Sequence, residues 1–305
     1  MATLAVMALV LGATACGSSS SNGSAAGTST TGSRSSTSST SGAGAPSTLA
    51  DGLPVPAHVV VVIEENHAAG QIIGSVSAPY MNALAQSGAD FTQSFAITHP
   101  SQPNYLALFS GSTHGVTDDS CPAPGSPYAE PNLAAGLVAA GKTFTGYSED
   151  LPSAGSTTCN AGDYARKHNP WVDFSNMPAS ANQPFTAFRS TSYAQLPTVS
   201  FVVPNLQHDM HDGTVLQADE WLKQYIGGYV DWAQDHDSLL VLTWDEDDET
   251  AVNRIPTLFV GPMVKAGSYA THITHYDVLR TIEEMYGVTP TGQAASATPI
   301  TGVWR

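Results

Sequence analysis

Four short segments of this chain carry residue types that could bind a metal and attack an electrophile. Three of them come directly after apolar runs and combine carboxylate, amide and imidazole groups, and the fourth places a serine before a helical pattern. Carboxylate and amide oxygens are the ligands of hard divalent cations. The residues concerned are Glu65, Asn66, Ser101, Asn104, His208, Asp209, His211, Asp245 and Glu246.

Two of these segments concentrate negative charge. Glu64-Glu65 ends one apolar run, and an acidic stretch over 245–249 follows another. Like charges held together without a cation repel each other and raise each other's pKa, and a bound metal removes that conflict. We expect Glu65 rather than Glu64 to be a ligand, and we interpret Asp247, Asp248 and Glu249 as a solvated loop.

The third segment, His208-Asp209-Met210-His211, follows an apolar run that ends at Val203. An imidazole in such a position can bind metal, hold a phosphate oxygen, or carry a proton to a leaving group. A single histidine is more often structural. Three useful side chains within four residues favour a role for at least one of them.

The fourth segment is His99-Pro100-Ser101-Gln102-Pro103-Asn104. Proline suits the first turn of a helix, so Ser101 is predicted at or just before the helix start. The free amides and the helix dipole there form an anion-binding geometry. Ser101 could then attack phosphorus while the amides and Asn104 hold the oxygens. The alternative is a plain capping serine; Ser110 and Ser112 compete for the role but lie at the helix end.

The elements that must position these groups alternate along the chain. Strands alternating with helical patterns predict βαβ units and an α/β fold with a mainly parallel sheet sandwiched by helices. Ligands of such sheets bind beyond the carboxyl ends of the strands, which is where the polar segments lie. Strands are predicted over 58–63, 91–97, 144–147, 198–203, 239–244 and 257–260, and helices over 79–87, 103–110, 132–140, 216–234 and 275–286.

Composition limits the classes of function. The 305 residues are 42% hydrophobic, enough for a large core, and 26 acidic against 10 basic residues give a formal net charge of −16. Nucleic-acid binding needs lysine and arginine to replace counterions, so no nucleic-acid partner is expected.

The N-terminal residues predict export. Residues 1–15 are apolar but too short to span a bilayer, which is typical of a signal peptide. Ala13-Thr14-Ala15-Cys16 is a relaxed lipobox, so we expect residues 1–16 to be a signal with lipidation at Cys16, which would bring the protein to a membrane through its lipid anchor. Plain secretion is the alternative. Residues 17–50 are a Ser/Thr/Gly linker, predicted to be disordered, and 51–305 form the folded domain.

Two further cysteines, Cys121 and Cys159, lie in the folded part. An exported protein with one such pair is expected to form a disulfide. Two free thiols are the alternative.

Several of these motifs together resemble the bacterial phosphoesterase family, which contains acid phosphatases and phosphatidylinositol-specific phosphatases, with phospholipases C as relatives. The resemblance covers about residues 57–288. It is carried by Glu64-Glu65-Asn66-His67 and by the segments HPSQPNYLALFSGSTHGV, PNLQHDMHDG and TWDEDDE.

This resemblance implies an alkaline-phosphatase-like fold and assigns roles to individual residues. Ser101 matches the nucleophile and Asn104 the oxyanion partner. Glu65 and Asn66 match the metal ligands of the first strand, and Asp245 and Glu246 those of the late strand. His208, Asp209 and His211 match the middle loop, and His275 is an additional partner. Two-zinc relatives have more histidine ligands, so this chain is expected to hold one divalent metal ion.

The sequence therefore predicts an exported phosphomonoester hydrolase, a cell-envelope lipoprotein or secreted enzyme, that forms a phosphoserine. Its substrate would be a small phosphomonoester or a phosphoinositide. A phospholipase C-type phosphodiesterase is the first alternative. A non-catalytic lipoprotein that binds phosphorylated ligands is the second, but such a protein has no need for Ser101 together with Asp245 and Glu246.

Overall fold

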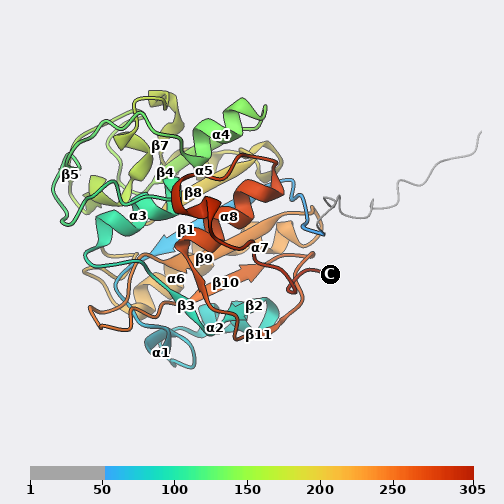
Figure 1. Cartoon of the computed structure of the whole chain (residues 1–305). Coiled ribbons are helices and arrows are strands. Elements are labelled where there is room, and N and C mark those ends of the chain that lie inside the picture. Colours follow the sequence, from blue (N-terminus) through green and yellow to red (C-terminus); the bar gives the residue numbers. More distant parts are fainter. Residues whose placement is uncertain (1–51) are drawn as a thin grey trace, which may run out of the picture. The chain divides into compact units, whose positions relative to one another are not determined.

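The computed structural model describes residues 52–305, so the expected signal, the lipidation at Cys16 and the whole linker over 17–50 lie outside the described residues. A sheet of eight strands in the order β11-β2-β10-β9-β1-β8-β4-β7 forms the centre of this part (Figure 1). These strands are β1 (Val59–Glu64), β2 (Ala89–Phe91), β4 (Phe144–Ser148), β7 (Asn182–Pro184), β8 (Val199–Val203), β9 (Leu239–Trp244), β10 (Thr257–Val260) and β11 (Gly267–Tyr269).

The middle of the sheet is parallel and fully buried. Strand β1 pairs in parallel with β8 on one side and with β9 on the other, and β4 pairs in parallel with β8 and β7. The run Val59 to Ile63 consists of β-branched residues, which suit a strand covered on both faces. Only β10 runs antiparallel, between β9 and β2. The predicted α/β class with a mainly parallel sheet is confirmed.

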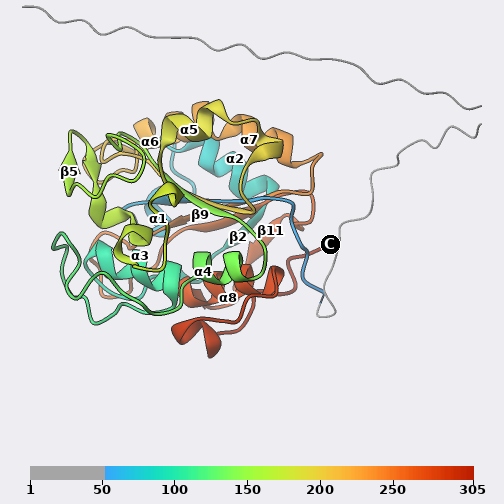
Figure 2. The same ribbon diagram turned by 90° about the horizontal axis from the view of Figure 1, so that it is seen from above.

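Helices cover both faces of the sheet, as Figure 2 shows from above. One face packs against α3 (Ser101–Ser110), α4 (Leu133–Ala139) and α8 (His275–Met285), and the other against α2 (Pro79–Ser87), α5 (Phe185–Ser190), α6 (Val215–Tyr225) and α7 (Gly227–Ala233). The remaining elements are short. They are α1 (Ala69–Ile72), β3 (Ser94–Phe95), β5 (Asn160–Ala161), β6 (Tyr164–Ala165), β12 (Ile273–Thr274), and the 3-10 helices η1 (Arg166–His168), η2 (Pro170–Asp173), η3 (Ala179–Ala181), η4 (Tyr193–Gln195) and η5 (Gly292–Ala295).

No helix in the described part of the chain is both long enough and apolar enough to cross a bilayer.

Three predicted elements differ from expectation by more than one residue at an end. The single helix over 216–234 is divided into α6 and α7 at Ile226, before the glycine pair Gly227-Gly228, where helix propensity is lowest. A side chain at Gly228 would also collide with the hydroxyl of Tyr193. The strand over 91–97 is replaced by the short strands β2 and β3. Helix α3 begins two residues earlier than predicted, which makes Ser101 its first residue and Pro100 its N-cap.

The parallel register brings the functional segments to one edge. Strand β1 ends at Glu64 directly opposite Trp244, the last residue of β9. The amide of Asp245 donates to the carbonyl of Glu64 (3.0 Å), and the amide of Glu65 donates to the carbonyl of Asp209 (2.8 Å). The segments after β1, β8 and β9 are thus joined by backbone hydrogen bonds at the carboxyl edge of the sheet.

Candidate active site

Ser101 lies at the centre of this edge and is buried. Its Oγ is 3.1 Å from Oε2 of Glu65 and 3.0 Å from Oε1 of Glu246. A hydroxyl has one hydrogen and can donate it to only one of these two carboxylates. This position differs from that of a capping serine, because the Ser101 hydroxyl faces these two carboxylates and Pro100 is the N-cap of α3.

The carboxylates around Ser101 are crowded and buried. Burial, followed by repulsion from Glu65 and Glu246, raises the pKa of Asp245 well above its ordinary value, and Oδ2 of Asp245 has no hydrogen-bond partner among the described residues. Burial raises the pKa of Glu246 to about 7, although His99 and Ser101 act in the opposite direction. The amide of Asn66 donates to Oδ1 of Asp245 (3.2 Å). This arrangement brings together the four expected metal-binding residues, and we call Glu65, Asp245 and Glu246 the carboxylate side.

Glu65 differs from its neighbours because it has donors around it. Burial alone would raise its pKa, but His168 and Tyr105 outweigh burial and lower the pKa to about 2. The hydroxyl of Tyr105 donates to Oε1 (2.7 Å), and Nε2 of His168 is 2.9 Å from the same oxygen. Glu64 points to the other face of the strand, where it is fully buried and burial raises its pKa. The preference for Glu65 over Glu64 as the site residue agrees with this geometry.

His99 contacts Glu246 on the side that is closer to solvent. Nδ1 of His99 is 2.5 Å from Oε2 of Glu246, and Nε2 is 3.0 Å from the carbonyl oxygen of Thr250. Asp247 lies beneath this loop and is buried, accepting hydrogen bonds from the amide and hydroxyl of Thr250. The interpretation of Asp247 as a solvated loop residue was wrong, because its carboxylate organises the turn that follows Glu246.

The start of α3 is less open to an anion than predicted. Pro103 has no N–H, and the amide of Gln102 donates to Oδ1 of Asp119 (2.9 Å). The side chain of Asn104 accepts from the amides of Ile97 and Thr98 and donates to the carbonyls of Thr98 and Pro100.

Both amide hydrogens of Asn104 are therefore in use. In the ligand-free structure the Asn104 side chain holds the loop before Ser101, and its expected contact with a phosphate oxygen stays a prediction. Positive charge for an anion comes from other side chains.

Those side chains lie on the opposite side of Glu65. His168 is buried between Oε1 of Glu65 and Oδ2 of Asp209, at 2.9 and 3.3 Å, and stacks on the ring of Tyr105. Burial alone would lower its pKa, but the two carboxylates outweigh burial and raise the pKa to about 9. The two carboxylates thus favour the charged form of His168, and Asp209 reaches the site as a partner of this histidine.

Lys167 and His211 extend the same side toward solvent. Nζ of Lys167 is 2.7 Å from Oδ2 of Asp119 and 3.2 Å from Nε2 of His211. Nδ1 of His211 is 2.8 Å from Oδ1 of Asp212. Burial alone would lower the pKa of Lys167, but Asp119 and Glu65 outweigh it and raise the pKa. We call Lys167, His168 and His211 the cationic side.

One oxygen of Glu65 and one nitrogen each of His168 and His211 lie within 4.8 Å of one another, which is a spacing that could hold a metal ion. The ammonium of Lys167 contacts His211 here, and Nε2 of His168 has no hydrogen-bond partner among the described residues. Oδ2 of Asp245 on the carboxylate side has none either. Glu65 belongs to both groups, so each offers ligands to a metal ion.

The remaining predicted histidines lie outside this cluster. Nδ1 of His208 is 2.8 Å from Oε2 of Glu149, and its ring stacks on Trp221, so the expected part of His208 at the phosphate is not supported by its contacts. His275 is buried with its Nε2 2.6 Å from the carbonyl oxygen of Asp245, and burial lowers its pKa to about 4. It contacts the backbone of Asp245 and stays neutral.

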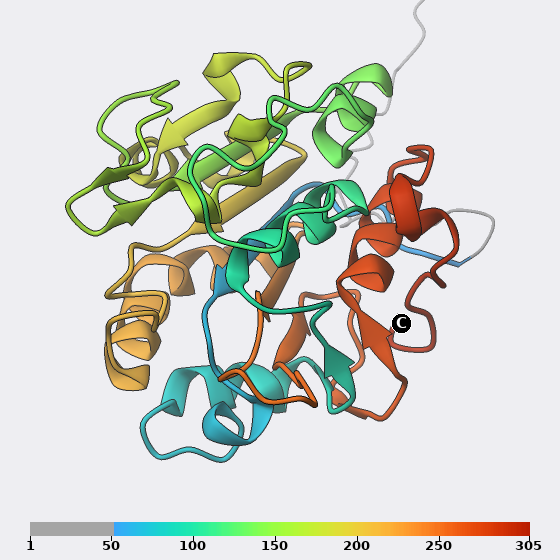
Figure 3. The ribbon, with the colours of Figure 1, turned by 60° about the vertical axis from the view of Figure 1, so that its left-hand side comes forward.

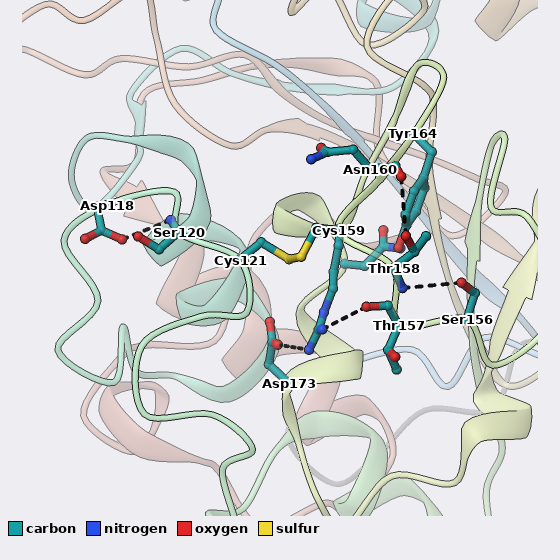
Figure 4. The surroundings of a disulfide bond; sticks show 12 residues. Asp118, Ser120, Cys121, Ser156, Thr157, Thr158, Cys159, Asn160, Tyr164 and Asp173 are labelled. Atoms are coloured by element: carbon teal, nitrogen blue, oxygen red, sulfur yellow. Dashed lines mark hydrogen bonds and ion pairs between the residues drawn. A yellow bond between two sulfur atoms is a disulfide. The ribbon is translucent and has the colours of Figure 1, made fainter.

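The cationic side is held in place by a covalent link. Cys121 and Cys159 form a disulfide, as predicted, with their Cα atoms 5.7 Å apart (Figure 4). Figure 3 shows the green loop after α3 beside the yellow-green segment between β4 and β7, and the disulfide joins these two. Arg166 reinforces the second segment by donating to Asp173 (2.7 Å) and to the carbonyl of Thr157 (3.0 Å).

Sequence reasoning missed His99, Tyr105, Lys167, His168 and Asp119. One signal could have found two of them. Arg166-Lys167-His168 is a run of three basic or imidazole residues in a chain with only ten lysines and arginines, and it begins seven positions after Cys159.

The architecture and the site together define a class of protein. The fold is similar to a solved protein of the alkaline phosphatase superfamily from Vibrio parahaemolyticus (TM-score 0.56, 14% identity, 82% of this chain and 71% of that one). It is also similar to the lipoteichoic acid synthase LtaP from Listeria monocytogenes (TM-score 0.54, 13% identity, 83% and 78%). The predicted alkaline-phosphatase-like fold is therefore confirmed.

The sequence profile of the Phosphoesterase family matches residues 76–289, and the chain belongs to this family. It is 54% identical to the phosphatidylinositol-3-phosphatase of Mycobacterium tuberculosis over 84% of this chain and 85% of that protein. It is 30% identical to the phosphate-repressible acid phosphatase of Penicillium chrysogenum, of which it spans 55%. The chain is accordingly an enzyme that hydrolyses phosphate esters.

Proposed function

We propose that this enzyme is an exported phosphomonoester hydrolase in which Ser101 attacks phosphorus and is transiently phosphorylated. The observation that carries the proposal is the position of Ser101. Its hydroxyl faces two carboxylates at 3.0 and 3.1 Å, and the cationic side begins at the far oxygen of one of them. A nucleophile needs a proton acceptor at hydrogen-bond distance and nearby positive charge for the phosphoryl oxygens.

The reaction would proceed in two steps. First Ser101 Oγ bonds to phosphorus, the bond from phosphorus to the alcohol oxygen breaks, and the hydroxyl proton passes through a neighbouring carboxylate to the leaving alcohol. Then water attacks the phosphoserine, the bond from Oγ to phosphorus breaks, and Ser101 regains a proton as inorganic phosphate leaves. Of the two histidines expected to serve the phosphate or the leaving group, His211 keeps that role because it lies on the cationic side.

The carboxylate side fits a hard divalent cation. Within residues 52–305, Oδ2 of Asp245 is buried without a hydrogen-bond partner, and the single hydrogen of Ser101 faces two acceptors. Glu65, Asp245 and Glu246, with Asn66 beside them, would hold such an ion through oxygen ligands. When bound, it would lower the pKa of the Ser101 hydroxyl and balance charge on the phosphoryl group.

The Mycobacterium tuberculosis relative is named for phosphatidylinositol 3-phosphate. Because this chain spans 85% of that relative at 54% identity, we propose a phosphoinositide monoester as a substrate class for this enzyme as well.

The test compares the full chain with Ser101→Ala on p-nitrophenyl phosphate and bis-p-nitrophenyl phosphate, with and without chelator. Ser112→Ala is the matched control, since Ser112 lies after the C-terminal end of α3. We expect Ser101→Ala to lose turnover while still binding inorganic phosphate, and chelator to reduce the wild-type rate. Near-normal monoester hydrolysis by Ser101→Ala would overturn the nucleophile, and faster diester than monoester hydrolysis by the wild type would favour a phosphodiesterase.

A further inference from the structure

Lys167 is part of the cationic side, but the two-step reaction gives it no individual role. Its side chain is about four-fifths shielded from solvent, and its ammonium makes two polar contacts, to Oδ2 of Asp119 and Nε2 of His211. An ammonium has three N–H groups, so one remains after these two contacts. Ordering a long lysine side chain in a partly buried site costs conformational entropy, which its polar contacts have to offset.

Asp119 ties this ammonium to the nucleophile. One oxygen of its carboxylate accepts from the amide of Gln102, the residue after Ser101, and the other accepts from Lys167. A single carboxylate therefore separates Lys167 from the first turn of α3. The same carboxylate occupies the amide that would otherwise bind an anion at the helix start. The backbone amide of Gln102 is thus used by Asp119, and the same carboxylate holds the positively charged Lys167 close to the start of α3.

Two other donor groups near Ser101 are already committed. Both amide hydrogens of Asn104 are bonded to backbone carbonyls, and His168 is enclosed by Glu65 and Asp209 with almost no exposed surface. Lys167 is more accessible than His168, with 18% of its side chain exposed against 2%. A phosphoryl group that enters from solvent would meet Lys167 before it meets His168.

Phosphate monoesters and diesters differ in charge, and Lys167 could distinguish them by this difference. A phosphate monoester dianion has three non-bridging oxygens, whereas a diester monoanion has two and carries a second ester group. A fixed ammonium interacts more strongly with the additional charged oxygen than with a neutral ester oxygen.

We propose that Lys167, held by Asp119, is the residue that makes this site selective for phosphate monoesters over diesters, by donating its third N–H to the oxygen that only the monoester carries as an anion. The inference rests on the proposed phosphomonoester hydrolase and deepens it. Asp119 is a positioning residue, because it acts through Lys167 and contacts no substrate itself.

The experiment measures kcat/KM on p-nitrophenyl phosphate and on bis-p-nitrophenyl phosphate for the full chain, Lys167→Met, Lys167→Arg and Asp119→Asn. Lys223→Met is the matched control, because Lys223 is exposed on α6. A charge-assisted hydrogen bond corresponds to about 10- to 100-fold in rate. We expect Lys167→Met to lose about 100-fold on the monoester and at most about 5-fold on the diester, and inorganic phosphate to inhibit it less strongly.

The two further variants separate selectivity from folding. Lys167→Arg should recover at least half of the loss on a logarithmic scale, since it keeps the charge. Asp119→Asn should lower the ratio of monoester to diester rates by about 5- to 10-fold. Equal losses on both substrates in Lys167→Met, or no recovery in Lys167→Arg, would overturn the inference. A wild-type enzyme without monoester activity would instead overturn the proposed function.

Discussion

The two sides of the Ser101 site are built in different ways. The carboxylate side comes from residues at the ends of β1 and β9, two buried parallel strands whose register fixes where Glu65, Asp245 and Glu246 lie. The cationic side comes from η1 and the loop after β8, which are short and irregular. The sheet positions one side, whereas hydrogen bonds and a disulfide position the other.

This difference has a consequence for stability within the site. Parallel strands in the middle of a sheet open only when the whole domain unfolds, whereas segments with few apolar contacts open locally. The carboxylate side should therefore persist as long as the fold does. The cationic side should respond to changes in its local contacts.

The largest effect is expected where the two sides meet. Glu65 contacts Ser101 on one oxygen, and Tyr105 and His168 on the other. Glu65→Gln should lower kcat on p-nitrophenyl phosphate by about 1,000-fold, because it removes a charge that both the nucleophile and His168 need. Steady-state kinetics measure this loss.

Glu64→Gln is the matched control for that variant. Burial raises the pKa of the Glu64 carboxyl and so favours its neutral form, which an amide of the same shape imitates; Glu64→Gln should therefore leave kcat within about threefold. Comparable losses of kcat in both variants would mean that activity depends on the packing at the end of β1 and not on the Glu65 carboxylate.

The next effect concerns the cationic side alone. His168→Gln should lower kcat by about 100-fold and the melting temperature by several degrees, because Glu65 and Asp209 would be left buried without their cation. Kinetics and thermal unfolding measure the two effects. His236→Gln, an exposed histidine stacked on Trp232, is the control. Unchanged kcat in His168→Gln would exclude the cationic side from catalysis.

Removal of the disulfide should affect the two sides unequally. Replacing Cys121 and Cys159 together by serine should lower the free energy of unfolding by about 2–4 kcal/mol, since the bond closes a loop over a sequence separation of 38. In the fraction that stays folded, the rate on monoesters should fall more than the rate on diesters, because Asp119 and Lys167 lose their alignment. Denaturant titration and the two substrates measure this. An unchanged ratio would show that the cationic side does not depend on the disulfide.

The fold and the carboxylate side were predictable because they follow from local patterns. The β-branched run before Glu64 and the apolar run before Asp245 specify buried strands, and parallel strands bring their carboxyl ends together. His168 and Lys167 were not predictable in this way. They follow the hairpin of β5 and β6, whose strands have two residues each and are too short to show a hydrophobic periodicity. The contacts of Asn104 with the backbone of 97–100 and of His208 with Glu149 were not predictable either, because no sequence pattern marks a side chain that bonds to a neighbouring loop or to a distant residue.

The smallest expected effect concerns Glu283, a buried carboxyl that belongs to neither the carboxylate side nor the cationic side. Burial raises the pKa of Glu283 to about 7, although Thr291 donates to it. Its folded pKa exceeds the unfolded value of 4.5, so its contribution to stability is full below about pH 4.5 and is lost as pH rises through 7. Glu283→Gln should remove about 2–3 kcal/mol of this pH dependence. Unfolding free energies at pH 4.5 and 8 test this, and an identical slope in both proteins would contradict it.

The central claim is covalent phosphorylation of Ser101. The most direct measurement is acid quenching of the full chain during turnover of p-nitrophenyl phosphate, followed by intact mass and peptide mapping. The account predicts one phosphoryl group on the peptide that contains Ser101, absent in Ser101→Ala and present in Ser112→Ala. Turnover without a modified peptide, or a phosphoryl group on any other residue, would contradict it.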